Sequence, residues 1–115
     1  MLNKLTQNII TLIKNIPKGK VISYGKIAFF AGNPNGARQV VRILHSCSQK
    51  YDLPWHRVVN AKLQISFKDD DAISEQRVML EKEGVRFSSK GKIEKQFLWQ
   101  IDFKDNMINL KDKSE

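Results

Sequence analysis

The sequence predicts a small, mostly α-helical domain that carries a helix-turn-helix and a short β-hairpin. Three observations support this fold class: apolar residues at helical spacing near the start, a dense Gly-Pro-Asn turn between two further helical stretches, and two short strand-like runs in the second half. The 115 residues suffice for one domain with a modest core. We place this domain at residues 1–99 and expect residues 100–115 to form a charged, poorly ordered C-terminal tail.

The first helix is predicted over residues 2–15, because residues 17–19 read Pro-Lys-Gly and end it. Its apolar face consists of Leu2, Leu5, Ile9, Leu12, Ile13 and Ile16. Lys and Asn interrupt this pattern, which therefore differs from the continuous apolar run of a signal peptide. No segment is long and apolar enough to span a membrane. We expect a cytoplasmic protein without a membrane partner.

A helix-turn-helix is predicted over residues 24–47. Ser23 suits the N-cap of a second helix at residues 24–31. Residues 32–36 read Gly-Asn-Pro-Asn-Gly and form a turn, after which a third helix covers residues 37–47. The second helix of such a motif usually contacts DNA, so the helix at residues 37–47 is the candidate recognition helix.

The candidate recognition helix has an apolar and a basic face. The residues expected to face inward are Val40, Val41 and Leu44. Arg38, Arg42 and His45 follow one another at spacings of four and three residues, so they share the other face. The whole chain has 20 Lys and Arg residues against 12 Asp and Glu residues, a net charge of +8. So basic a domain favours a polyanionic partner, and nucleic acid is the first candidate.

The second half is predicted to hold a polar loop at residues 48–53, a hairpin and one more helix. The hairpin pairs a strand at the end of residues 54–60 with a strand at residues 63–67. Asp69, Asp70 and Asp71 cap a helix that runs to about Glu83, and Gly84 stops it. Residues 97–99 form the last packed segment.

Cysteine and histidine are scarce. Cys47 is the single cysteine of the sequence, so no internal disulfide forms, which is consistent with a reducing compartment. With two histidines besides it, a dedicated zinc site is not expected. We therefore expect neither a metal nor a cofactor.

Three stretches together resemble a known family. They are residues 16–28 (IPKGKVISYGKIA), residues 31–34 (AGNP) leading to residues 37–40 (ARQV), and residues 54–59 (PWHRVV). In order and spacing they are similar to the DNA-binding and active-site domain of the O6-alkylguanine-DNA alkyltransferases, and the resemblance covers about residues 2–99. This implies a winged helix-turn-helix-like fold.

The chain departs from the active members of that family at one position. Active members carry Pro-Cys-His-Arg, and their cysteine takes the alkyl group from guanine, whereas Trp55 stands at that place here. An indole nitrogen is a hydrogen-bond donor without an available lone pair, so Trp55 is no substitute for a thiolate nucleophile. The chain thus resembles the alkyltransferase-like proteins, which bind the lesion and lack the acceptor. His56 and Glu83 match the family's activating relay, and without a thiol we expect them to be structural.

The resemblance implies two sets of site residues. The DNA-binding set is Tyr24, Gly36, Ala37, Arg38, Gln39 and Arg42, in which Arg38 fills the gap left by a flipped nucleotide and Tyr24 lies against that nucleotide's phosphate. The lesion-pocket set is Tyr24, Trp55, His56, Arg57, Val58 and Lys68. The small residues at positions 36 and 37 would let backbone N–H groups approach a phosphate.

The function implied is that of a non-enzymatic sensor of DNA damage. It would bind duplex DNA containing O6-alkylguanine from the minor groove, flip the modified nucleotide and direct it to nucleotide excision repair proteins, acting as a monomer. In a bacterium it would associate with the nucleoid, and in a eukaryote it would be nuclear.

Two other functions stay open. One is an alkyltransferase with Cys47 as a displaced acceptor, and the other is a sequence-specific helix-turn-helix transcription regulator. Cys47 also stands where the family often has an asparagine, and Leu63 where it usually has a glycine. We therefore expect the hinge before the site and the shape of the hairpin to differ from the family's.

Overall fold

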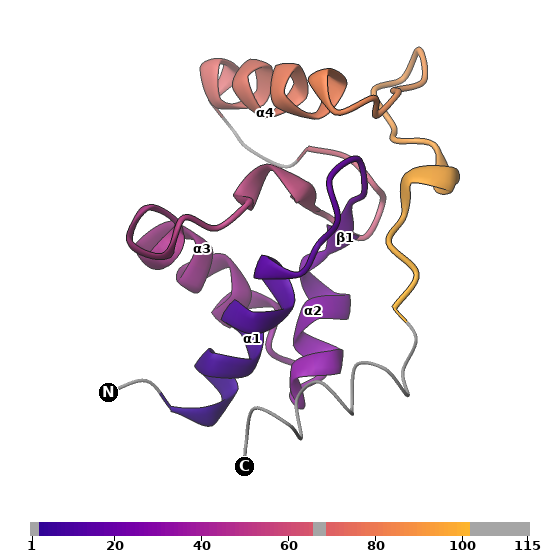
Figure 1. The fold of residues 1–115 in the computed structure, drawn as a ribbon. Coiled ribbons are helices and arrows are strands. Elements are labelled where there is room, and N and C mark those ends of the chain that lie inside the picture. The colour runs from indigo at the N-terminus through magenta and orange to yellow at the C-terminus, as the bar shows by residue number, and fades with distance from the viewer. Residues whose placement is uncertain (1–2, 66–68, 102–115) are drawn as a thin grey trace.

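The computed structural model describes residues 3–65 and 69–101, and its order of elements is shown in Figure 1. The helices are α1 (Lys4–Lys14), α2 (Tyr24–Ala31), α3 (Ala37–Tyr51) and α4 (Asp70–Lys82), with short 3-10 helices η1 (Trp55–Arg57) and η2 (Lys95–Phe97). The strands are β1 (Ile22–Ser23) and β2 (Val58–Val59). This confirms the mostly helical class with a small two-stranded sheet.

Helices α1, α2 and α3 pack around the larger of two hydrophobic clusters. Ile9 and Ile13 of α1, Ile27 of α2 and Val40 of α3 are fully buried there. Asn3 caps α1, because its Oδ1 accepts a hydrogen bond from the backbone N–H of Thr6 at 2.8 Å. The first helix therefore begins two residues later than predicted and ends one residue earlier.

The helix-turn-helix is confirmed in α2, the turn after it and α3. Ser23 is the N-cap of α2, and its Oγ accepts from the backbone N–H of Lys26 at 3.2 Å. Gly32 ends α2 with φ +109°, a left-handed conformation that glycine adopts without steric cost. The backbone N–H of Gly36 then closes the turn on the carbonyl of Asn33 at 2.9 Å. Helix α3 starts at Ala37, as predicted.

Helix α3 is longer than predicted, and the polar loop at residues 48–53 was a wrong prediction for most of its length. The helix continues to Tyr51 and ends where Asp52 takes φ +52°. Polar residues continue a helix when one face meets solvent, and the hydroxyls of Ser46 and Ser48 bond back to the carbonyls of Arg42 and Leu44.

The inward face of α3 also differs from the prediction. Val40 is fully buried and Leu44 is half-buried, but Val41 is 48% exposed, and Ile43 lies in the core instead. A helical turn of 3.6 residues places position 41 next to positions 38, 42 and 45. Val41 therefore belongs to the outer, basic face.

The small sheet is parallel, and the predicted hairpin is wrong. Ile22 pairs with Val58 and Ser23 with Val59, so β2 takes β1 as its partner rather than the run at residues 63–67, which lies partly outside the described residues. After β2 the chain turns on Asn60, whose Oδ1 accepts from the backbone N–H groups of Lys62 and Gln64 at 2.9 and 3.0 Å. The backbone N–H of Asn60 donates to the carbonyl of Gln64 at 3.1 Å, so the chain reverses in a tight turn, and no strand follows it among residues 61–65.

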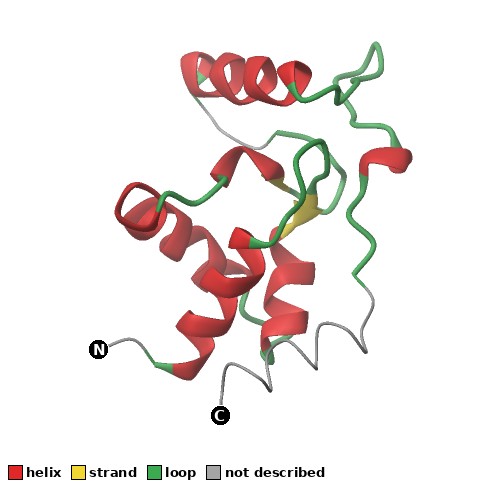
Figure 2. Cartoon of the chain, in the orientation of Figure 1, coloured by secondary structure: helices red, strands yellow, loops and turns green. Residues whose placement is uncertain are grey.

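The second hydrophobic cluster lies between α4, the sheet and the C-terminal part of the described chain. It contains Val21, Val59, Leu63, Leu80, Val85 and Ile93. The Oδ1 of Asp69 caps α4, and Gly84 follows the helix with φ +93°, so both predicted ends of this helix are confirmed. In Figure 2, α4 and the α1–α3 bundle lie on opposite sides of the short strands.

The segment at residues 97–99 is packed, as predicted. The backbone N–H of Val21 donates to the carbonyl of Phe97 at 2.8 Å, and the N–H of Trp99 donates to the carbonyl of Val21 at 2.7 Å. The side chain of Trp99 packs against the larger cluster. The tail was predicted to begin at residue 100, but Ile101 still packs against the larger cluster. Residues 102–115 of the predicted tail lie outside the described residues. None of the helices of residues 3–65 and 69–101 combines the length and apolar character that crossing a bilayer requires.

Candidate nucleic-acid interface

The N-terminus of α3 is built from small residues. Gly36 is its N-cap, is buried, and provides no side-chain cap. A methyl group at Gly36 would lie 2.9 Å from Asn33 Nδ2 and 3.0 Å from Gln39 Oε1, so any larger side chain would disturb the turn. Asn33 Nδ2 donates to Gln39 Oε1 at 3.0 Å. A helix N-terminus of this kind presents backbone N–H groups and a positive dipole end to an anion.

The outer face of α3 carries the predicted basic residues. Arg38, Arg42 and His45 are exposed, and Val41 lies among them. Arg38 stands in the first turn of the helix, beside Ala37 and Gly36. Four of the predicted DNA-binding residues thus lie together at the N-terminus of α3, namely Gly36, Ala37, Arg38 and Gln39. Arg42 lies one turn further along the helix. Gln39 belongs to the same turn, although its Oε1 already accepts from Asn33.

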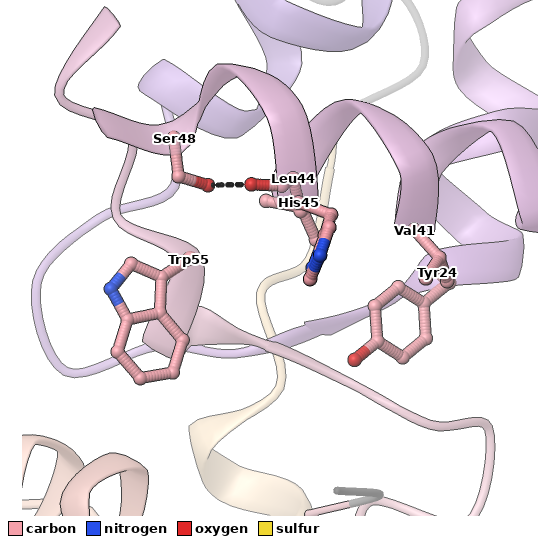
Figure 3. A pocket seen from close by; sticks show the side chains of 6 residues that line it. All are labelled: Tyr24, Val41, Leu44, His45, Ser48 and Trp55. Atoms are coloured by element: carbon pink, nitrogen blue, oxygen red, sulfur yellow. Dashed lines mark hydrogen bonds between the residues drawn. The ribbon is translucent and has the colours of Figure 1, made fainter. Parts of the chain in front are cut away.

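A cavity of about 300 Å³ lies between Tyr24 and Trp55. Tyr24, the first residue of α2, closes one side and Trp55, the first residue of η1, closes the other. Helix α3 lines the cavity with Val41, Leu44, His45 and Ser48. In Figure 3 the imidazole of His45 points from α3 into the space between the two aromatic rings. A concave, largely apolar space of this volume is typical of a small-molecule or nucleobase site.

A second cavity, of about 530 Å³, adjoins the first at Trp55. It shares His45, Ser48 and Trp55 with the first cavity. Its remaining lining consists of Gln49, Asp52, Leu53, Pro54, His56 and Met79. Trp55 therefore lines both cavities, and so do His45 and Ser48 of α3.

The position of Trp55 depends on an ion-pair cluster behind it. His56 Nε2 lies 2.8 Å from Glu83 Oε2, and Arg57 contacts the same carboxylate through Nη2 at 2.7 Å and Nε at 3.0 Å. Arg57 Nη1 also donates to the carbonyl of Ile16 at 2.9 Å, and the backbone N–H of Gly19 donates to Glu83 Oε1 at 2.9 Å. These bonds tie the segment after α1, η1 and the end of α4 into one unit.

This cluster keeps Glu83 ionised. Desolvation by burial raises the pKa of Glu83, but the hydrogen bonds from Arg57, His56 and the Gly19 backbone lower it by more. The net effect lowers the pKa from its ordinary value of 4.5 to about 2. An ionised carboxylate only accepts hydrogen bonds, so His56 donates through Nε2.

The lesion-pocket residues predicted from the sequence are partly brought together. Tyr24 and Trp55 line the first cavity, and Trp55 and His56 line the second. Arg57 and Val58 are not among the lining residues: Arg57 binds Glu83, and Val58 is 1% exposed in the core. Lys68 lies outside the described residues.

Several cavity residues were missed by the sequence analysis. Val41, Leu44 and Ser48 line the first cavity because α3 extends past its predicted end and turns Val41 outward. Gln76 supports the site from α4: it is 1% exposed, and its Nε2 donates to the carbonyls of His56 and Val58 at 2.9 and 3.1 Å. A glutamine within a helix gives no sequence signal for such a role.

The two departures from the family pattern have clear positions. Cys47 lies within α3, is half-buried, packs against the larger hydrophobic cluster, and lines neither cavity. Leu63 has φ +60°, a left-handed conformation that favours glycine, and its buried side chain packs in the second cluster. No group of three or more His, Cys, Asp or Glu side chains suited to a metal occurs in the part of the chain that the structure describes.

Comparisons with known proteins identify relatives of the whole domain. The chain is 43% identical over 93 residues to a DNA base-flipping protein of Vibrio parahaemolyticus, covering 80% of this chain and 92% of that one. It is 41% identical over 90 residues to a DNA base-flipping protein of Escherichia coli, covering 78% and 69%. Its fold matches that of Schizosaccharomyces pombe Atl1 in complex with damaged DNA containing O6-carboxymethylguanine, with a TM-score of 0.72, 30% identity and coverage of 88% and 99%.

The sequence profile of one family matches most of the chain. This family is described as 6-O-methylguanine DNA methyltransferase, DNA binding domain, and the match covers residues 4–85, which include the helix-turn-helix, both strands, Trp55 and Glu83. The chain therefore belongs to the family of the 6-O-methylguanine DNA methyltransferase DNA-binding domain.

Proposed function

We propose that this protein is a non-enzymatic sensor of alkylated DNA, which binds O6-alkylguanine in duplex DNA and flips the modified nucleotide into the cavity between Tyr24 and Trp55. The observation that carries this proposal is the position of Trp55, the residue at the acceptor site of the family, in the wall of that cavity. An indole there offers the alkyl group an apolar surface and no nucleophile. Relatives named for base flipping, and Atl1 bound to damaged DNA, support the same function.

The contacts with DNA would come from α3. Its N-terminus and its basic face would offer backbone N–H groups, Arg38 and Arg42 to the phosphates. Arg38 would enter the duplex where the nucleotide leaves it. Contacts in the minor groove distinguish few base pairs, so they suit a protein that searches for damage in any DNA sequence. We propose that it acts as a monomer, in the nucleoid or the nucleus, and hands the lesion to nucleotide excision repair proteins.

An alkyltransferase that uses Cys47 is the second candidate. Cys47 packs against the core and lines neither cavity, so a flipped guanine between Tyr24 and Trp55 would not meet its sulfur directly. Of the two candidates, the geometry therefore favours the sensor.

The test is a titration of the protein against two duplexes that differ only by one O6-methylguanine, at a fixed salt concentration. Tighter binding to the methylated duplex, together with unchanged protein and DNA masses after incubation, is the result expected of a sensor. A gain of about 14 Da on the protein, as expected when a methyl group replaces a hydrogen, would instead identify an alkyltransferase. Equal binding to both duplexes, with unchanged masses of protein and DNA, would contradict both proposals.

A further inference from the structure

We propose that a groove between α1 and α3 binds the sugar–phosphate backbone of duplex DNA, so that α1 contacts DNA together with the helix-turn-helix. The two helices lie side by side in Figure 1, and the groove between them has a volume of about 180 Å³. Three residues of each helix line it, namely Leu5, Thr6, Ile9, Gln39, Arg42 and Ile43. The inference rests on the proposed function, because it takes DNA to lie along the basic face of α3.

The groove has an apolar floor and a polar rim. Ile9 is fully buried and Ile43 is 8% exposed, so the floor is apolar. Thr6 on the α1 side and Gln39 and Arg42 on the α3 side carry the polar groups of the rim. A segment of DNA backbone has a matching two-part character, because charged phosphates alternate with less polar deoxyribose rings.

The rim has donors for phosphate oxygens. Gln39 Oε1 accepts from Asn33 Nδ2 at 3.0 Å, which orients the amide and leaves its Nε2 as the donor end. Arg42 is exposed and offers a planar guanidinium, which binds phosphate through two parallel N–H groups. Thr6 adds a hydroxyl. Arginine, glutamine and threonine side chains all contact phosphates in protein–DNA complexes, so this rim suits the DNA backbone.

The charges around the groove are also complementary to DNA. Thr6 and Gln39 each belong to the first turn of their helix, so both helix N-termini lie at the groove. Neither first turn contains Asp or Glu, the residues that stabilise this end of a helix, and Lys4 and Arg38 stand there instead. These cations are unfavourable for the helices themselves. Together with Arg42 they give the groove a positive potential, which a phosphate would neutralise.

The groove continues the interface that the proposed function places on α3. Gln39 directly follows Arg38, and Arg42 lies one turn further along the same helix. A backbone contact at the groove does not involve the modified base. It should therefore strengthen binding to damaged and undamaged duplexes by the same factor, and so hold the protein on DNA during the search for a lesion.

Thr6→Glu tests the α1 side of the groove, and Thr6→Gln is its matched control, because the two side chains have the same number of heavy atoms and differ in charge. Glutamate three residues after the Asn3 cap favours the start of a helix, so we expect Thr6→Glu to unfold at a higher urea concentration than Thr6→Gln. We also expect Thr6→Glu to bind methylated and undamaged duplexes about three- to ten-fold more weakly than Thr6→Gln. A gain in stability with a loss of affinity excludes misfolding as the cause.

Thr11→Glu and Thr11→Gln repeat this comparison on the same helix. Thr11 is half-buried like Thr6 and does not line the groove. It lies about 7.5 Å further along the axis of α1. Since a charge at that distance is largely screened at physiological salt, we expect the affinities of the two Thr11 variants to agree within about two-fold.

The same comparison in an Arg42→Ala background identifies the source of the loss. A carboxylate at position 6 could act by pairing with Arg42 across the groove, rather than by repelling a phosphate in it. If Thr6→Glu still binds more weakly than Thr6→Gln when Arg42 is absent, the groove itself takes the backbone. If the difference disappears, the contact through α1 is overturned.

The outcomes separate this inference from the proposed function. If the wild-type protein does not prefer the methylated duplex, the proposed function fails, and the position-6 variants on undamaged DNA then decide the groove inference. If the preference is present, but the two Thr6 variants bind equally or differ no more than the two Thr11 variants, the groove inference alone is overturned. A loss confined to the methylated duplex would also contradict it, because a backbone contact does not depend on the lesion.

Discussion

His56 Nε2 lies 2.8 Å from Glu83 Oε2, although 27 positions separate the two residues in the sequence. The carboxylate that holds this imidazole also holds the guanidinium of Arg57 and the backbone N–H of Gly19. Because Trp55 directly precedes His56 in η1, the same cluster sets the position of the indole between the two cavities. In a chain with tryptophan at the acceptor site, the cluster therefore has a structural role, because it fixes the wall of the site.

Replacing Glu83 with glutamine should destabilise the fold. The amide would keep the shape of the side chain but leave the partly buried guanidinium of Arg57 without a countercharge. We expect the free energy of unfolding in urea to fall by about 2–4 kcal/mol. Glu81→Gln is the matched control, since Glu81 is about half exposed and pairs with Arg77 at 3.5 Å, and it should cost less than about 0.5 kcal/mol. Equal costs for the two variants would show that the cluster does not hold the fold together.

The stability of the wild-type protein should also depend on pH through Glu83. Its pKa falls from the ordinary 4.5 to about 2 in the folded protein, so its contribution is fully present above pH 4.5 and is lost as the pH falls toward 2. Its side chain is only 10% exposed, and the contribution is at most about 3 kcal/mol. Unfolding free energies of wild type and Glu83→Gln should therefore converge between pH 5 and about pH 2, and a constant difference over this range would contradict the assignment.

The sequence was sufficient to predict the helices whose ends carry strong local signals. Ser23, Asp69 and Gly84 mark helix ends through side-chain caps and positive φ, and the structure confirms all three. The far end of α3 was missed because residues 48–50 are polar, so hydrophobic periodicity gives no signal there. Local patterns also do not indicate which distant strand becomes a partner, so the parallel pairing of β1 with β2 was not predicted.

As with the fold, only part of the candidate site was predicted from the sequence. The resemblance indicated Tyr24 and Trp55, and the structure places them on opposite sides of one cavity. The resemblance also included Val58 in the pocket, yet its side chain is 1% exposed and lies in the larger cluster. Gln76 supports His56 from another helix, through a contact that only the tertiary structure creates.

Replacing Arg38 with Ala should weaken binding to the methylated duplex by about 1–3 kcal/mol, because in the proposed complex its side chain fills the gap left by the flipped nucleotide. Lys82→Ala is the matched control, since it removes one positive charge from an exposed position on α4. Fluorescence anisotropy titrations at one salt concentration give both affinities. If Arg38→Ala lost no more affinity than Lys82→Ala, Arg38 would contribute only its charge.

Replacing Gly36 with Ala should weaken binding to damaged and undamaged duplexes alike. The added methyl group would lie 2.9 Å from Asn33 Nδ2 and 3.1 Å from the Asn33 carbonyl, so the turn must shift and the first N–H groups of α3 shift with it. Since these groups face the phosphates in the proposed complex, the loss does not depend on the lesion. We also expect the free energy of unfolding to fall by about 1 kcal/mol from the crowding.

Gly25→Ala is the matched control for stability, because a methyl group there has no atom within 4 Å and Gly25 lies in α2, where alanine is favoured by about 0.5–1 kcal/mol. The two glycine-to-alanine changes should therefore shift the urea midpoint in opposite directions. A Gly36→Ala variant that matched wild type in both stability and affinity for undamaged DNA would mean that the turn absorbs the methyl group through the flexible ends of Asn33 and Gln39. The N-terminus of α3 would then not be positioned by the absence of a side chain at Gly36.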